Sequence, residues 1–409
     1  MAPCLLIPFC KDKDEIDHEL FAKAIGEENE GGGFPDYCLY SLAERKLVSL
    51  NNGRSNSNIV IPDHAVCIGS SHGWLAYIHC RSDDYVLGDD YDLYLTNPLI
   101  TPVPTTIQIP SLKCIPKRVV MSSPPPSASG DDHCTVLMAI DFQHSLAYYK
   151  LGDSCWRGKL DYKKLVDVED EAEDEENEAE DEEKEDPWKY DDIVYSPKDQ
   201  LFYCIDYYKQ IEAWDLRSKA RARGPPCKLR IAFDDSSFQK PDFPEYELKP
   251  RSIIGKLYLV VDPFSADILS IHRCGEVIAK DGTILDDWEN WKDEYYFKTH
   301  RFEVYRLNVA NKSLEYIECL DDRVVFVGDN QSYMVSAQDF PPGVLMPNSI
   351  YFTPDSIFFE GTKEPLQNLK EADMGVYNLR DFTVTPIFPS HHPLNNILQP
   401  VMWFNPNRC

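Results

Sequence analysis

Phe302-Glu-Val-Tyr-Arg-Leu307 is one of six copies of a short phrase, each with an aromatic residue two positions before a leucine or, in one copy, a threonine. The separations between the shared aromatic positions are 54, 55, 65, 91 and 72 residues. A unit that recurs at such intervals indicates one supersecondary module repeated along the chain. The shared aromatic residues are Tyr40, Tyr94, Tyr149, Trp214, Tyr305 and Tyr377.

Short strand-like runs surround each phrase. Around Tyr305 they cover 256–262, 267–273, 301–308 and 313–320. Four such runs in chain order predict an antiparallel meander. Because the other units divide similarly, we predict an all-β fold, a β-propeller of four-stranded antiparallel blades. The count is six blades; five or seven remain open, because the last unit is too long by one strand.

The two ends of the chain complement each other. The first unit is short, and the apolar run Val401-Met-Trp-Phe404 has no partner nearby in sequence. We expect this C-terminal strand to join the N-terminal blade, because closing the ring protects strand edges that would otherwise template aggregation. Residues 1–409 are then a single propeller domain, because repeated units share one continuous core.

The repeated aromatics are expected to be blade core. A strand aromatic at the same place in every blade packs between neighbouring sheets, and burying one removes roughly 150–250 Å² from water. At about 25 cal/mol/Å² this contributes roughly 4–6 kcal/mol before opposing terms. The alternative is that these side chains line a ligand site at the channel or on a loop face.

Composition narrows the partners. The net charge is −28, which argues against nucleic acid and anionic membranes as partners. No run of 18 apolar residues occurs. The 13 cysteines include no Cys-x-x-Cys and no set at zinc-ligand spacing. We expect a monomer with reduced cysteines and no cofactor or metal, in the cytoplasm, the nucleus or both.

Three charged insertions interrupt the units, at 161–188, 217–228 and 275–297. Between Asp167 and Asp186 there are 15 acids and one base, a composition expected to be disordered. This acidic run is interpreted as a solvated loop or as a docking element for a basic protein partner. The basic segment 217–228 is a further candidate to pair with it internally.

Several segments carry a family resemblance. They are IGSSHGWL at 68–75, LTNPL at 95–99, VFVGDNQSYMVSA at 325–337 and PNSIYFTPD at 347–355. Together they resemble plant F-box-associated proteins that contain a KIB-type β-propeller, over roughly residues 36–405. The motif residues are Gly69, Ser70, Ser71, His72, Gly73, Trp74, Asn97, Pro98, Asn348, Ser349, Tyr351 and Phe352.

The resemblance implies a propeller and, for many members, an F-box that recruits a ubiquitin ligase. No Leu-Pro-x-x-Leu segment of that kind precedes the propeller units here. Recognition of ligase substrates through another adaptor contact therefore stays an alternative.

The sequence offers no catalytic constellation. Ser71 and His72 are adjacent on a predicted strand and point to opposite faces, so they are not expected to form a nucleophile–base pair. His391-His392 lies in a Pro-flanked loop and is a weak metal candidate. The leading hypothesis is a non-enzymatic scaffold for protein interactions. The alternative is a small-ligand binder or enzyme with its site at the channel mouth, which a deep pocket there would favour and a plugged mouth would not.

Overall fold

A computed structural model shows the fold and describes these residues: 2–8, 37–49, 65–80, 91–98, 105–112, 116–125, 135–141, 146–157, 190–216, 227–233, 253–279, 281–285, 295–355, 373–388 and 401–406. The acidic insertion predicted at 161–188 lies outside them, as does His391-His392. In the described residues no helix is long and apolar enough to cross a membrane.

The first three sheets are antiparallel. The first consists, in order across the sheet, of β25 (Met402–Phe404), β1 (Cys4–Pro8), β2 (Tyr37–Ser41) and β3 (Lys46–Ser49). The second consists of β4 (Val66–Ser71), β5 (Trp74–Cys80), β6 (Tyr91–Asn97) and β7 (Thr105–Leu112). The third consists of β8 (Pro116–Met121), β9 (Val136–Asp141) and β10 (Leu146–Lys150).

The other three sheets are longer or more varied. The fourth consists of β11 (Tyr190–Ser196), β12 (Leu201–Asp206), β13 (Ile211–Trp214) and β14 (Cys227–Ile231). The fifth consists of β15 (Ile253–Val261), β16 (Ile268–Ala279), β18 (Tyr295–Asn308) and β19 (Ser313–Tyr316), with β17 (Ile284–Leu285) on β16. The sixth consists of β21 (Tyr333–Ser336), β20 (Arg323–Val327), β22 (Ser349–Phe352), β23 (Gly375–Asn378) and β24 (Val384–Thr385).

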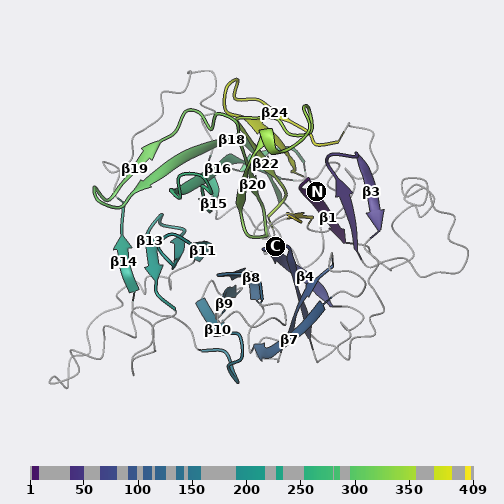
Figure 1. The fold of residues 1–409 in the computed structure, drawn as a ribbon. Helices are drawn as coiled ribbons and strands as arrows, with labels where there is room; N and C mark the ends of the chain where they lie inside the picture. The colour runs from purple at the N-terminus through teal and green to yellow at the C-terminus, as the bar shows by residue number, and fades with distance from the viewer. Residues whose placement is uncertain are drawn as a thin grey trace, which may run out of the picture.

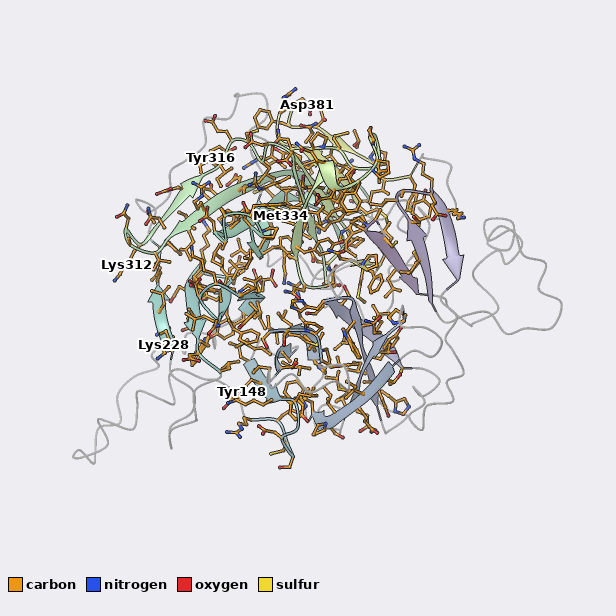
Figure 2. All side chains as sticks on the ribbon, viewed as in Figure 1. Tyr148, Lys228, Lys312, Tyr316, Met334 and Asp381 are labelled. Atoms are coloured by element: carbon orange, nitrogen blue, oxygen red, sulfur yellow. The ribbon has the colours of Figure 1, made fainter. Side chains whose placement is uncertain are left out.

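The six sheets stand in a ring and form a six-bladed β-propeller (Figure 1). Strands β4, β8, β11 and β15 lie toward the centre, while β3, β7, β14 and β19 lie at the rim. Strand β25 pairs with β1, with Leu5 opposite Trp403, so the C-terminal strand closes the ring as predicted. Side chains fill the space between the sheets, and Lys228 and Lys312 mark the outer rim (Figure 2).

The sixth blade differs from the predicted antiparallel meander. After β21 the chain passes through a short 3-10 helix, η4 (Ala337–Asp339), and enters β22 on the far side of β20. Strands β20 and β22 therefore run parallel, with Val324 opposite Ser349. This arrangement leaves β21 on the inner edge and accounts for the additional strand of the last unit.

The third blade is smaller than predicted within the described residues. In place of the fourth strand of a four-stranded blade, a single bridge pairs Tyr148 with Arg157. Two hydrogen bonds between the backbones of these residues hold the bridge, at 2.9 and 3.3 Å.

The bounds predicted for the charged loop, 275–297, are wrong at both ends. Strand β16 continues to Ala279 and β18 begins at Tyr295, because the ladder continues past an irregularity at Cys274 and Gly275. Gly275 permits this: a Cβ there would lie 2.2 Å from the carbonyl oxygen of Lys298. The predicted loop 217–228 also ends early, since β14 already begins at Cys227.

The six repeated aromatics lie between blades, one at each seam. Each belongs to a different hydrophobic cluster that combines residues of two neighbouring sheets. None is more than 9% exposed, and Trp214 and Tyr377 are 0% exposed. The repeated aromatic therefore joins each blade to the next.

Replacing Tyr305 by Ala should lower the free energy of unfolding by about 3–5 kcal/mol. Its ring lies against His272 and Tyr316, at centroid distances of 4.7 and 5.7 Å, and its hydroxyl donates to Glu303 Oε2 at 2.8 Å. Urea titration of the full chain measures the loss. Val309→Ala, at an exposed position just after the same strand, is the control and should change little. An unchanged unfolding midpoint in Tyr305→Ala would contradict packing at this seam.

Candidate functional site

A five-residue loop, Gly328–Ser332, joins β20 to β21 and reaches strands of four other blades; we call it the channel plug. Two of its side chains bind the first two blades. Asn330 Oδ1 accepts a hydrogen bond from the backbone N–H of Trp403, on β25, at 3.0 Å. Gln331 Oε1 accepts one from the hydroxyl of Ser71, at the end of β4, at 2.5 Å.

The plug also binds the third and fourth blades. Arg118, on β8, donates from Nη2 to the carbonyl oxygen of Gly328 at 2.5 Å. Ser332 donates from its hydroxyl to Asp192 Oδ2, on β11, at 3.4 Å. Polar atoms of one loop thus hold the inner strands of four blades together.

Gly328 lets the plug begin where it does. A Cβ at this position would lie 2.0 Å from Thr353 Oγ1. No side chain fits at that distance, so the close approach of the loop to Thr353, just after β22, requires glycine.

The free edges of the inner strands are capped by carboxylates. Strand β15 ends its sheet, and its backbone N–H groups at Leu257 and Leu259 have no neighbouring strand to bind. Asp191 Oδ2 accepts from Leu257 at 3.3 Å, and Asp192 Oδ2 accepts from Leu259 at 2.8 Å. The two adjacent acids of β11 therefore accept the hydrogen bonds that a neighbouring strand would otherwise accept.

An ion pair between Arg118 and Asp192 stands at the centre of this arrangement. The two side chains are 3% and 0% exposed. Burial lowers the pKa of Arg118, but Asp192 and Asp329 outweigh burial, so the net shift is upward and the guanidinium stays charged. Burial raises the pKa of Asp192, against the opposing effects of Arg118 and the Leu259 N–H.

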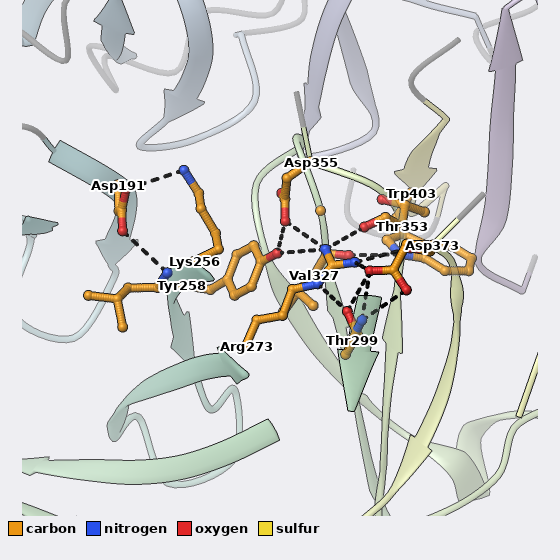
Figure 3. A network of polar contacts seen from close by, with 12 residues as sticks. Asp191, Lys256, Tyr258, Arg273, Thr299, Val327, Thr353, Asp355, Asp373 and Trp403 are labelled. Atoms are coloured by element: carbon orange, nitrogen blue, oxygen red, sulfur yellow. Dashed lines mark hydrogen bonds and ion pairs between the residues drawn. The ribbon is translucent and has the colours of Figure 1, made fainter. Parts of the chain in front are cut away.

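A second buried network joins the fifth and sixth blades around Arg273 (Figure 3). Its guanidinium binds Asp355 Oδ2 at 2.6 Å, Asp373 Oδ2 at 2.8 Å and Thr299 Oγ1 at 2.7 Å. The hydroxyl of Tyr258 also donates to Asp355. Arg273 thereby ties residues on both sides of segment 356–372 to β16, although that segment lies outside the described residues.

The motif residues Ser70, Ser71 and His72 bind neighbouring blades. Ser70 donates to the carbonyl oxygen of Trp403 at 2.6 Å. Ser71 accepts from the N–H of Met121 at 3.2 Å, while the His72 ring lies 3.2 Å from the carbonyl oxygen of Met121. Ser71 and His72 thus bind the same backbone unit of β8.

The turn into β5 is made by two of the motif residues. His72 and Gly73 both have positive φ angles, of 51° and 76°. Gly69 lies within β4, at a strand irregularity. Trp74 is buried.

The remaining motif residues lie inside the blades. Asn97 is buried at the end of β6, and Pro98 follows it in the turn. Asn348 has φ 56° and accepts from the N–H of Leu320 at 2.7 Å. Ser349 donates to the carbonyl oxygen of Met346. Tyr351 and Phe352 are buried in β22.

Sequence reasoning missed the buried charges. Arg118, Asp191, Asp192, Lys256 and Arg273 were not singled out, although each lies within a run predicted as a strand or beside one. A charged residue in a short apolar run was the available signal. In the described residues no group of three or more His, Cys, Asp or Glu side chains could hold a metal ion.

Asp206 is a buried acid at the end of β12. Its Oδ1 accepts from the N–H of Gln210 at 2.7 Å, and its Oδ2 has no hydrogen-bond partner among the described residues. Burial, together with the nearby Glu212 and Asp191, raises its pKa to about 7 against the lowering effect of backbone hydrogen bonds. The folded protein therefore binds this proton more tightly than the unfolded chain does.

Removing one partner of the central ion pair should be costly. Arg118→Met leaves the Asp192 carboxylate buried without its cation, and we expect a loss of about 3–5 kcal/mol in the free energy of unfolding. Arg118→Met/Asp192→Asn should lose less, because no unpaired charge remains. Urea titration of both variants gives the coupling. If the double variant were no more stable than Arg118→Met, the two side chains would not be coupled.

Asp206→Asn should make stability less dependent on pH. The contribution of Asp206 is fully present below its ordinary pKa of 3.8 and is lost as the pH rises toward 7. The stability of the Asn variant relative to the wild type should therefore increase by about 2–3 kcal/mol between pH 5 and pH 8. Melting temperatures from pH 5 to pH 8 measure this. A difference independent of pH would show that Asp206 does not titrate in this range.

The comparisons with known proteins concern the family and the fold. The model of the KIB1-4 beta-propeller family matches residues 39–378. No curated protein matches the chain.

Three solved structures match the chain at low similarity. They are the allergen Mala s 1 of Malassezia sympodialis (7% identity, 73% of this chain and 85% of that one, TM-score 0.31), a putative 6-phosphogluconolactonase of Bacteroides fragilis (8%, 77% and 81%, 0.32) and apo AztD of Citrobacter koseri (11%, 74% and 74%, 0.30). At these TM-scores they carry no argument about function. The family match covers most of the chain and agrees with the six-bladed ring: this protein belongs to the KIB1-4 β-propeller family.

Proposed function

We propose that the protein is a non-enzymatic platform for protein interactions. The channel plug is the observation that carries this proposal. A propeller that binds a small ligand in its channel needs polar groups aimed into an open position. Here Ser71, Arg118 and Asp192 bind the plug or one another instead, and their hydrogen bonds are internal to the ring.

The charge distribution supports a basic protein as the partner. The segment between Asp167 and Asp186 contributes −14 of the net charge of −28. A concentrated charge of one sign attracts a partner of the opposite sign and speeds encounter. Asp191, five residues after this segment, already pairs with the buried Lys256 of β15 at 3.5 Å.

The topology separates the acidic segment from the basic one. The acidic segment precedes β11, and the basic segment 217–226 follows β13. Strands β11 and β13 run in the same direction, because each is antiparallel to β12. The two segments are therefore attached at opposite ends of the fourth blade, which favours an external partner over internal pairing.

Affinity purification with the full chain tests the proposal. We expect the wild type to retain basic proteins from an extract of the source organism. A variant with the 15 acids of 167–186 changed to Asn or Gln should lose them. The matched control changes Arg217, Lys219, Arg221 and Arg223 to Gln and should keep them.

Two results would contradict this expectation. One is retention of no protein above the level of empty beads. The other is retention of the same set by the wild type and the acid-free variant. Recovery of ubiquitin-ligase adaptor and cullin subunits would instead favour a role in substrate recognition.

A further inference from the structure

Tyr207 and Tyr208 form the tip of the β12–β13 hairpin. They are 59% and 56% exposed, the highest values among the large hydrophobic side chains of the described residues. Their rings meet edge to face, with centroids 5.7 Å apart and an interplanar angle of 81°. Exposed tyrosines of this kind are typical anchors of protein interfaces.

The hairpin holds this pair in place. The Asp206 N–H donates to the carbonyl oxygen of Gln210 at 3.0 Å, and the Lys209 N–H donates to that of Asp206 at 2.9 Å. The Asp206 carboxylate closes the turn by accepting from the Gln210 N–H at 2.7 Å. A preorganised aromatic tip loses little conformational entropy when a partner binds.

The acidic run that precedes β11 in the chain favours a positively charged partner segment. Tyr190 pairs with Asp206 across β11 and β12, so the chain enters the fourth blade beside the tip. Asp186, the last acid of the run, is four residues from Tyr190, a span of at most roughly 14 Å. The turn carries one base, Lys209, and Lys184 and Lys189 lie within and just after the run, so there are three bases against the 15 acids of that run.

Buried carboxylates lie below the same end of the blade. Asp206 and Glu212 are each 1% exposed. Asp206 Oδ2 and Glu212 Oε1 have no hydrogen-bond partner among the described residues, although Arg230 Nε is 3.4 Å from Glu212 Oε1. Glu212 is already paired with Arg230 and accepts from the Tyr190 hydroxyl and the Trp214 ring N–H. The direct attraction for Lys and Arg side chains at the tip therefore comes from the tyrosine ring faces.

We propose that the Tyr207–Tyr208 tip binds a lysine- and arginine-rich segment of a partner protein. This inference rests on the proposed function and deepens it, because it assigns the contact surface and the chemistry of the segment. The basic segment 217–226 of the same chain is attached at the other end of the blade, and the net charge of −28 disfavours nucleic acid as the occupant.

The test uses a fluorescent twelve-residue peptide of alternating Lys, Arg and Gly, with a glutamate peptide as the negative probe. Anisotropy titrations at one fixed ionic strength compare full-length variants. Tyr207→Ala/Tyr208→Ala should weaken binding of the basic peptide about tenfold, as the loss of two cation–π contacts implies. Tyr207→Phe/Tyr208→Phe should stay within about twofold of the wild type, because the rings remain.

Phe264→Ala is the matched control. Phe264 is 55% exposed in the turn after β15. Strand β15 runs alongside β11 in the same direction, as Asp191–Leu257 and Asp192–Leu259 show, so this turn lies at the opposite end of the blades. Its removal should leave peptide binding unchanged. Melting temperatures equal to the wild type will show that each variant is folded.

Three outcomes would overturn the inference. The first is equal affinity of the basic peptide for the wild type and the Ala double variant. The second is equal binding of the glutamate peptide. The third is concentration-dependent self-association in sedimentation that disappears when Arg217, Lys219, Arg221 and Arg223 become Gln, because the occupant would then be a second copy.

The two proposals can fail separately. If partners are retained in affinity purification but peptide binding does not depend on the tyrosines, the proposed surface is wrong and the proposed platform function stands. If the wild type retains no partner, the platform falls, and the peptide titrations still decide whether the tip binds cations.

Discussion

A ring of sheets leaves the inner edge of each blade without a neighbouring strand, and satisfying those edges is the constraint on which the rest of this structure depends. Backbone groups buried at the centre of the ring need partners that no strand supplies. The carboxylates of Asp191 and Asp192, the hydroxyls of Ser70 and Ser71, and Asn330 of the plug supply them. The charges at the centre therefore stabilise the ring. Arg118 supplies the positive charge that the buried Asp192 carboxylate needs.

The same constraint explains why no blade is self-sufficient. Every hydrophobic cluster at a seam contains residues of two blades, and the repeated aromatics lie in these shared clusters. Polar contacts cross the seams as well: Arg273 binds residues of the fifth and sixth blades at once. The ring is thus held by apolar contacts between the sheets and by hydrogen bonds at its inner edges.

Much of this architecture could be predicted from the repeated aromatics, because each repeated unit is recognisable from a few consecutive residues. The blades followed from them, and the closing strand followed from the short first unit and the unpartnered apolar run at 401–404. Strand order did not, since the run of residues in β20, β21 and β22 is the same whether β22 joins β21 or β20. The channel charges were missed for a different reason. Arg118 and Asp192 are 74 positions apart, and Arg273 and Asp355 are 82 apart, so only the fold shows that each has a buried partner. The plug lay in a segment noted for its resemblance, but its contacts with four blades are tertiary.

The pairing of Leu5 with Trp403 has a consequence for biosynthesis. The two strands are about 400 residues apart in the chain, and at 5–20 residues per second the first strand waits roughly 20–80 s for its partner. During that interval the partners of the plug on β25 do not yet exist, and one edge of β1 stays open. The incomplete ring therefore exposes unpaired strand edges, which can pair with other chains, for far longer than a single blade needs to fold. A folding helper that shields β1 until translation reaches Trp403 would protect this open edge.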